Sequence, residues 1–188
     1  MAVNICLALG SNVCGRWGRS RATLARAVEV LEEEGVSIRA ISSAYITRPL
    51  GLSRQPDYVN LAILAETSMP PWQIVATAKR LERAAGRRMG PRWSARPLDI
   101  DLIDYAGRVV RWTSDPVPRP KLMLPHPEAH RRGFVLVPMA EIAPHWRHPV
   151  LGLTPGEFLR RTPHLTSGVT RLERERLDHR GALCNMRV

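Results

Sequence analysis

The stretch GRRMGPRWSARPLDIDLIDY, residues 86–105, joins a basic loop to an apolar strand. From Leu98 to Tyr105, apolar residues alternate with aspartates over the first five positions, which predicts a strand with one buried face. Ile100 and Leu102 should point into a core, and Asp99 and Asp101 should point away from it. This strand matters for the fold because it is the last element of a regular series of strands and helices that begins at the N-terminus.

The elements before this stretch follow one another in a regular order. Apolar patterns predict strands over 3–9, 36–47 and 58–67 and a helix over 20–34 that stops at Gly35. A second helix should begin near Pro70 and Pro71, since proline is tolerated in a first helical turn, and should end at Gly86. The resulting βαββαβ order predicts an α+β fold, a ferredoxin-like sandwich with helices packed on an antiparallel sheet.

The second half of the chain is less regular. Residues 107–125 should form a long loop, 134–137 a further strand, and 138–142 and 154–161 short helices. We expect one domain over residues 1–164. The basic C-terminal tail, residues 165–188, is polar and arginine-rich, and we assign no regular structure to it.

Composition limits the function classes. With 188 residues, 44% hydrophobic and 24% charged, the chain can bury one core. It has no apolar run of the roughly 18–20 residues that a membrane helix needs and no secretory signal pattern, so we expect a cytoplasmic protein without a membrane partner. The net charge of +11 fits a nucleic-acid partner, an anionic substrate or neither.

Asp99 and Asp101 are the first candidate site. Residues i and i+2 of a strand share a face, which would place the two carboxylates about 6–7 Å apart. Paired carboxylates repel unless a cation lies between them, and Mg²⁺ prefers carboxylate, phosphate and water oxygens. The alternative is a strand whose exposed face carries two acids without a role.

The basic loop directly before these aspartates is the second candidate. It carries Arg87, Arg88, Arg92 and Arg96, with Trp93 among them. Arginine donates paired hydrogen bonds to phosphate oxygens, and tryptophan stacks on flat rings. Solvated arginines on a surface loop are the alternative, but a phosphate-binding loop next to a metal-binding carboxylate pair is what phosphoryl transfer needs.

Two further segments could bind a substrate. Tyr58 and Asn60 share a strand face near the loop at 47–51, where a ring and a side-chain amide could recognise a flat heterocycle. His126, followed by Arg131 and Arg132, could contact phosphate. Each of these also has a purely structural interpretation. Since the sequence has neither a GxxxxGK[ST] loop nor a GxGxxG turn, a nucleotide would be bound by other means.

Six segments in order are similar to those of one family. ALGSN (8–12), SSAYITRPLG (42–51), QPDYVNLA (55–62), the helix end KRLERAAGR (79–87), RPLDIDLI (96–103) and LPHPEAHRRGFVLVPMAEIAP (124–144) resemble the 6-hydroxymethyl-7,8-dihydropterin pyrophosphokinase family. The resemblance implies a ferredoxin-like fold and transfer of pyrophosphate from ATP to the pterin hydroxyl, giving pterin diphosphate and AMP in folate biosynthesis. It also implies a monomer or a homodimer.

The resemblance assigns roles residue by residue. It implies that Asp99 and Asp101 bind two Mg²⁺ ions and that Arg92 and Arg96 take part in catalysis. The implied pterin contacts are Thr47, Leu50, Tyr58, Asn60, Trp93 and Phe134. The implied ATP contacts are Glu82, Arg92, Trp93, Arg96, Lys121, His126 and Arg132. The chain departs from the family pattern at Ser94-Ala95, where glycine and proline are usual, and at Arg48, where proline is frequent. We expect these departures to bear on loop geometry and kinetics more than on the reaction.

Two alternatives remain at this point. One is a pterin-binding paralogue that is inactive or acts on a shifted substrate, given Ser94-Ala95. The other is a basic RNA-binding module on the same fold, but only 5% of residues are aromatic and the sequence has no RNP1-type motif. We therefore expect ATP and the pterin, rather than nucleic acid, as partners.

Overall fold

The computed structural model describes residues 1–49, 55–88, 94–112 and 122–172. Leu50, Arg92, Trp93 and Lys121, all predicted to lie in the site, fall outside these residues. The strands are β1 (Val3–Ser11), β2 (Ser37–Ile41), β3 (Tyr45–Thr47), β4 (Tyr58–Thr67), β5 (Asp99–Tyr105) and β6 (Val169–Arg171). The helices are α1 (Ser20–Glu33), α2 (Pro71–Ala84), α3 (Gly133–Ile142) and α4 (Pro155–Arg161), with short 3₁₀ turns η1 (Ala129–Arg131) and η2 (Pro163–Thr166).

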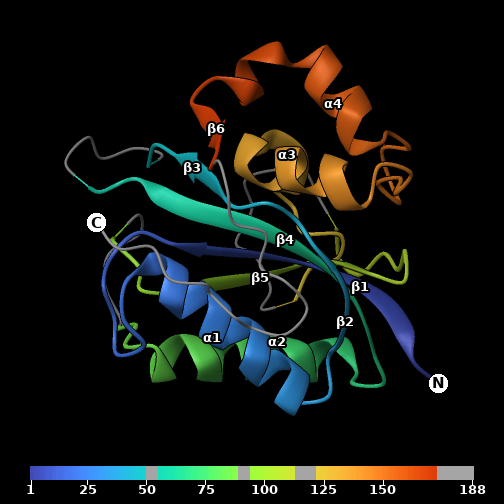
Figure 1. The fold of residues 1–188 in the computed structure, drawn as a ribbon. Helices are drawn as coiled ribbons and strands as arrows, with labels where there is room; N and C mark the ends of the chain where they lie inside the picture. The colour runs from blue at the N-terminus through green and yellow to red at the C-terminus, as the bar shows by residue number, and fades with distance from the viewer. Residues whose placement is uncertain (50–54, 89–93, 113–121, 173–188) are drawn as a thin grey trace.

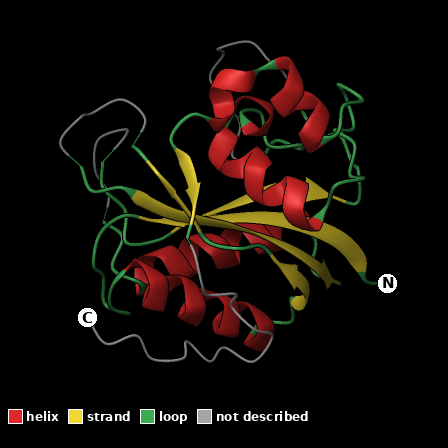
Figure 2. Cartoon of the chain, turned by 45° about the horizontal axis from the view of Figure 1, so that its top comes forward, coloured by secondary structure: helices red, strands yellow, loops and turns green. Residues whose placement is uncertain are grey.

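The strands form one antiparallel sheet in the order β5-β1-β4-β3-β6, with β2 pairing with β4 beside β3. Helices α1 and α2 cover one face of this sheet, and α3 and α4 cover the other (Figure 1, Figure 2). The α+β prediction, a ferredoxin-like sandwich with an antiparallel sheet, is confirmed. In the described part of the chain, no helix is long and apolar enough to cross a membrane.

The two faces follow from the alternation along each strand. In β1, Ile5, Leu7 and Leu9 join a large buried cluster beneath α1 and α2, while Cys6 and Ala8 join a smaller one beneath α3. Strand β5 divides in the same way, because Ile100 and Leu102 pack into the large cluster as expected. Asp99 and Asp101, which alternate with them, are therefore directed to the face that carries α3.

Helices α1 and α2 form where the apolar spacing predicts them. Leu24, Ala27, Val28 and Leu31 are the buried stripe of α1, and Ile74, Ala78 and Leu81 that of α2. Both helices are followed by a glycine in the left-handed region, Gly35 with φ of 89° and Gly86 with φ of 104°. The glycine stop signals are thus confirmed.

The strand predicted over 36–47 is interrupted. Ser42 bonds β4 through its backbone and its side chain, since its amide donates to the Ala62 carbonyl at 3.0 Å and its Oγ accepts from the Ala62 amide at 2.9 Å. The side-chain bond replaces one rung of the ladder, so the segment is divided into β2 and β3.

The predicted strand over 134–137 is wrong, because these residues belong to α3. A short apolar run looks the same in a buried helix and in a buried strand, and here it is held between β4 and α4. The short helices predicted over 138–142 and 154–161 are present as the end of α3 and as α4. For residues 165–172 the sequence predicted no regular structure, but they contain the end of η2 and strand β6.

Candidate functional site

A cavity of about 150 Å³ opens on the α3 face of the sheet, where β1, β3, β4 and β5 come together. Its size lies in the range of cavities that hold a small aromatic molecule. It is lined by Ala8, Leu9, Gly10, Thr47, Arg48, Pro49, Gln55, Tyr58, Asn60, Arg96, Asp99, Asp101, Arg132 and Phe134. Apolar rings, a carboxylate pair and guanidinium groups thus share one space.

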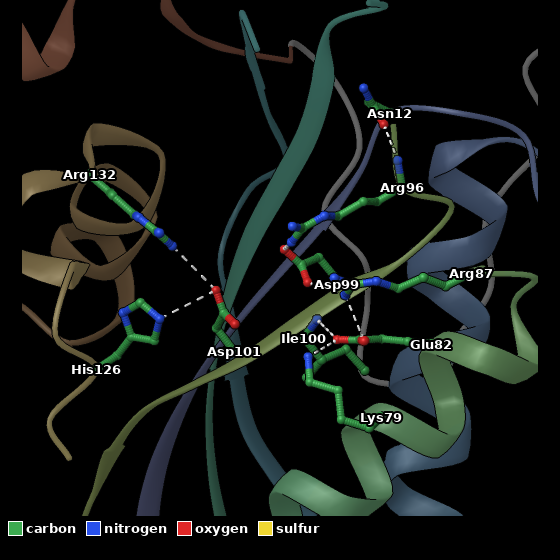
Figure 3. Close-up of polar contacts among 10 residues, drawn as sticks. All are labelled: Asn12, Lys79, Glu82, Arg87, Arg96, Asp99, Ile100, Asp101, His126 and Arg132. Carbon is green, nitrogen blue, oxygen red and sulfur yellow. Dashed lines mark hydrogen bonds and ion pairs between the residues drawn. The ribbon is translucent and has the colours of Figure 1, made fainter. Parts of the chain in front are cut away.

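Asp99 is surrounded by arginines from the loop that precedes it. Its two carboxylate oxygens pair with Arg87 and Arg96, each at 2.5 Å (Figure 3). Burial opposes ionisation, but Arg96 and then Arg87 outweigh it and hold the pKa of Asp99 below its ordinary value. Asp99 is therefore a carboxylate at neutral pH and can bind a cation.

Glu82 lies behind Asp99, on α2. It is 1% exposed, and its Oε1 accepts from the Ile100 amide at 3.0 Å and from Lys79 at 2.7 Å. Its Oε2 pairs with Arg87 at 2.6 Å (Figure 3). Burial raises the pKa of Glu82. In the structure Glu82 thus fixes the start of β5 and the position of Arg87.

Asp101 faces a second group of basic residues. Its Oδ2 lies 3.7 Å from His126 Nε2 and 3.5 Å from Arg132 Nη1, and both side chains point toward it (Figure 3). Arg132 immediately precedes α3, and the His126 amide donates to the Ile103 carbonyl of β5 at 2.9 Å. The segment 126–132 is thereby held against the strand that carries both aspartates.

The residues proposed for heterocycle binding also meet here. Asn60 and Thr47 are each 5% exposed, and Asn60 Nδ2 donates to Thr47 Oγ1 at 2.8 Å. Tyr58 and Phe134 provide rings in the same lining, one from β4 and one from α3. Burial raises the pKa of Tyr58, which keeps its hydroxyl protonated.

Asn12 is a residue that the sequence reasoning missed. It is 3% exposed, and its Oδ1 accepts from the Arg96 amide at 2.7 Å while its Nδ2 donates to Gln55 at 3.1 Å and to the Pro56 carbonyl at 3.2 Å. Asn12 therefore joins the loop before Asp99 to the segment before Tyr58. Its position in the ALGSN motif was the signal that could have pointed to it.

The structure brings most of the predicted residues together. Thr47, Tyr58, Asn60, Arg96, Asp99, Asp101, Arg132 and Phe134 line the cavity. Outside the cavity lining that the described residues form, His126 lies 3.7 Å from Asp101, and Glu82 is joined to Asp99 through Arg87. Arg87, named in the predicted phosphate-binding loop, pairs with Glu82 and Asp99. Gly10, which had no predicted role, lines the cavity beside Asn60.

The donor set fits magnesium bound together with a phosphate chain. Two carboxylates lie on one strand face, and the described residues contain no group of three or more His, Cys, Asp or Glu that could enclose a metal ion alone. Mg²⁺ usually takes one or two carboxylates and completes its coordination with phosphate oxygens and water. Asp99 and Asp101 match that requirement.

Comparisons with known proteins agree with this geometry. The model of the family described as 7,8-dihydro-6-hydroxymethylpterin-pyrophosphokinase matches residues 6–144. A protein of Methylorubrum extorquens named 2-amino-4-hydroxy-6-hydroxymethyldihydropteridine pyrophosphokinase is 40% identical over 139 residues, 73% of this chain and 81% of its own length. Its Aquifex aeolicus namesake is 32% identical over 146 residues, 78% of this chain and 84% of its own length.

Other relatives are longer. The namesake from Synechocystis is 38% identical over 120 residues, which are 64% of this chain but 57% of that protein. Among solved structures, Plasmodium falciparum HPPK-DHPS with pteroate aligns with a TM-score of 0.68 and 12% identity over 91% of this chain and 46% of its own. At that identity the likeness concerns the fold alone.

Proposed function

The chain belongs to the 7,8-dihydro-6-hydroxymethylpterin-pyrophosphokinase family, and we propose that it transfers pyrophosphate from ATP to the hydroxyl of 6-hydroxymethyl-7,8-dihydropterin in folate biosynthesis. The products are the pterin diphosphate and AMP. The family match and the names of relatives that cover most of both chains support this reaction.

One observation carries the proposal. A single cavity is lined by two rings, a buried amide, two aspartates and arginines. A flat heterocycle between Tyr58 and Phe134 would place a short alcohol arm next to the carboxylates. Phosphoryl transfer depends on positioning and charge stabilisation, and this arrangement offers both.

The chain's own residues divide the work. Asn60 and Thr47 would bond the polar edge of the pterin, which Tyr58 and Phe134 hold by its faces. Asp99 and Asp101 would hold two Mg²⁺ ions, which neutralise charge on the phosphates when bound. Arg96 and Arg132 line the cavity and would donate to phosphate oxygens.

In this arrangement the pterin hydroxyl oxygen forms a bond to the β-phosphorus of ATP. The bond from that phosphorus to the bridging oxygen of the α-phosphate breaks, AMP leaves, and the hydroxyl proton is released. Arg87 and Glu82 act indirectly, because they fix the position of Asp99 and the start of β5.

The test is to identify the nucleotide product. Purified protein is mixed with ATP, Mg²⁺ and 6-hydroxymethyl-7,8-dihydropterin, and nucleotides are separated by chromatography. We expect AMP, formed only when both the pterin and Mg²⁺ are present. ADP would mean attack at the γ-phosphorus and would contradict the mechanism. No turnover would indicate an inactive paralogue and would direct attention to Ser94-Ala95.

Location and assembly belong to the same proposal. We infer a cytoplasmic enzyme that acts as a monomer or a homodimer, with ATP and the pterin as its partners. Gel filtration with light scattering of the purified protein measures the assembly state directly, and a trimer or larger species would contradict it.

A further inference from the structure

The segment 163–172 contacts two elements that contribute residues to the candidate site, although it lies beyond residues 6–144 that the family model matches. It contains η2, which packs on α3, and β6, which packs on β3 (Figure 1). No residue of the segment lines the cavity, so the segment can act on the site only through the elements that it contacts.

The first contact extends the sheet at β3. Strand β6 pairs with β3 in the register Tyr45 with Arg171, Ile46 with Thr170 and Thr47 with Val169, and the Leu172 amide adds a bond to the Ala44 carbonyl at 2.9 Å. Strand β3 has only three residues and pairs with β4 along its other edge. Without β6 it would be a short edge strand, which frays readily.

Strand β3 carries one of the pocket's binding groups. Thr47 ends the strand and lines the cavity, and its Oγ1 accepts the bond from Asn60 Nδ2. Arg48 and Pro49 follow directly and also line the cavity. The position of this wall therefore depends on how firmly the three residues of β3 are held.

Arg171 ties β6 to both β3 and α3. Its guanidinium donates from Nε and Nη2 to Ser43 Oγ at 2.9 and 2.6 Å and lies 3.5 Å from Glu141 Oε1. Ser43 Oγ in turn donates to Glu141 at 2.9 Å, and the Tyr45 hydroxyl donates to the same carboxylate at 2.9 Å. Burial and then the bond to Glu141 raise the pKa of Tyr45 to about 12, so its hydroxyl remains a donor.

The second contact is at the start of α3. A Cβ placed on Gly133 would lie 1.7 Å from the Leu165 carbonyl oxygen, so the backbone of η2 lies directly against this glycine. The neighbours of Gly133 are Arg132 and Phe134, which both line the cavity. The segment thus contacts two elements that contribute to the cavity lining, β3 through β6 and the start of α3 through η2.

We propose that Pro163–Leu172 braces the pterin pocket and that Arg171 is a positioning residue for it. This inference rests on the proposed function, since it names what the brace positions. Arg171 acts through Ser43, Glu141 and Tyr45 on the strand that presents Thr47, and it does not touch the substrate.

The test compares two arginines of the same kind. Arg171→Ala removes the brace contact, and Arg39→Ala is the matched control, because Arg39 also lies on an edge strand, pairs with a glutamate at 2.7 Å and has a side chain 54% exposed against 57% for Arg171. Each variant removes one positive charge. We expect a pterin KM about 5- to 10-fold higher for Arg171→Ala, an ATP KM within about 2-fold of wild type, and no change in either for Arg39→Ala. Arg171→Lys should recover part of the loss.

A measurement without substrate separates this inference from the proposed function. Amide hydrogen exchange in Tyr45–Thr47 should be faster in Arg171→Ala than in Arg39→Ala. If wild type makes AMP and exchange rises but the pterin KM is unchanged, the segment is only structural and the positioning role is wrong. If exchange does not rise, the proposal that Arg171 holds β3 in place is wrong. If wild type makes no AMP, the proposed function fails first, and a pterin role for Arg171 fails with it.

Discussion

The two faces of the sheet differ in what they bury. Beneath α1 and α2, leucines, isoleucines, valines and alanines form one large cluster, with members from both helices and from β1, β4 and β5. Beneath α3 the buried apolar cluster is small, and the remaining area holds the cavity with its rings, amide, aspartates and arginines. One face thus stabilises the fold, and the other presents chemistry on it.

Because the two faces differ in this way, substitutions on the same strand should change either the stability of the protein or its activity, depending on the face. Successive residues of β1 and β5 point to opposite faces, so neighbours in sequence should have different effects when changed.

Asp101→Asn should have the largest effect, and it should lower activity without changing stability. The change removes a charge in the cavity at nearly constant volume, and we expect kcat to fall about 100-fold or more, on the order of 3 kcal/mol in the barrier. The free energy of unfolding should stay within about 0.5 kcal/mol of wild type, because the side chain is only partly buried and its neighbours lie at 3.5 and 3.7 Å.

The matched control is Asp57→Asn, an exposed acid next to Tyr58 that does not line the cavity. Its kcat should match that of wild type. Steady-state assays with a chemical denaturation curve for each protein measure both quantities. Wild-type turnover in Asp101→Asn would remove the metal-binding assignment of this residue.

Leu7→Ala should have the converse effect. Leu7 is 0% exposed in the large cluster, and its truncation should lower the free energy of unfolding by about 3 kcal/mol through lost burial and a residual cavity. Cys6→Ala, at the preceding position on the other face, removes one sulfur atom and should lower it by about 1 kcal/mol. Urea titrations compare them, and equal losses would mean that the two faces contribute alike.

The same contrast explains what could be predicted from the sequence. Strands 3–9, 58–67 and 98–105 and both long helices were predictable because their apolar period is local and repeats on the α1 and α2 face. The α3 face depends on contacts far apart in sequence. Asn12 and Arg96 are 84 residues apart, and Arg171 and Ser43 are 128 apart.

Particular residues show the limit. The run Phe134–Val137 carries no period that separates strand from helix, and only its position between β4 and α4 decides it. The site aspartates were predictable because a strand of alternating type has only one polar face. The supporting roles of Glu82 and Asn12 were not predictable, because each depends on contacts that only the folded chain makes. Glu82 joins α2 to β5, and Asn12 joins the residue after β1 to the loop before β5.

A pH-dependent loss of stability should come from His148, on the α3 side. It is 1% exposed among the rings of Trp112, His130, Trp146 and Phe158, and its Nδ1 accepts from the Val150 and Leu151 amides at 3.3 and 3.1 Å. Burial, and then His130, lower the pKa of His148 from 6.5 to about 4.

The unfolded state therefore binds a proton below about pH 6.5 that the folded state does not bind until about pH 4, so stability falls as the pH drops through that window. By pH 5 the loss assigned to His148 should be about 2 kcal/mol. His148→Asn keeps an acceptor near the Nδ1 position and cannot be protonated in this range. The denaturation midpoint of this variant should change less between pH 7.5 and 5 than that of wild type. An equal change in both proteins would show that groups other than His148 control the loss of stability in acid.

Gly10→Ala should have the smallest effect and should act on substrate affinity. A Cβ at this position on β1 would lie 2.8 Å from Asn60 Oδ1, closer than carbon and oxygen can approach. The side chain of Asn60 can move aside, but it then loses its 2.8 Å bond to Thr47. We expect the pterin KM to rise about 5-fold, close to 1 kcal/mol, with kcat nearly unchanged. The free energy of unfolding should fall by about 1 kcal/mol, because a buried hydrogen bond is lost. Asn60→Ala removes the obstacle as well as the amide, so adding Gly10→Ala to it should raise KM little further. A full additional 5-fold rise in the double variant would mean that Gly10 acts on the pocket by another route than Asn60.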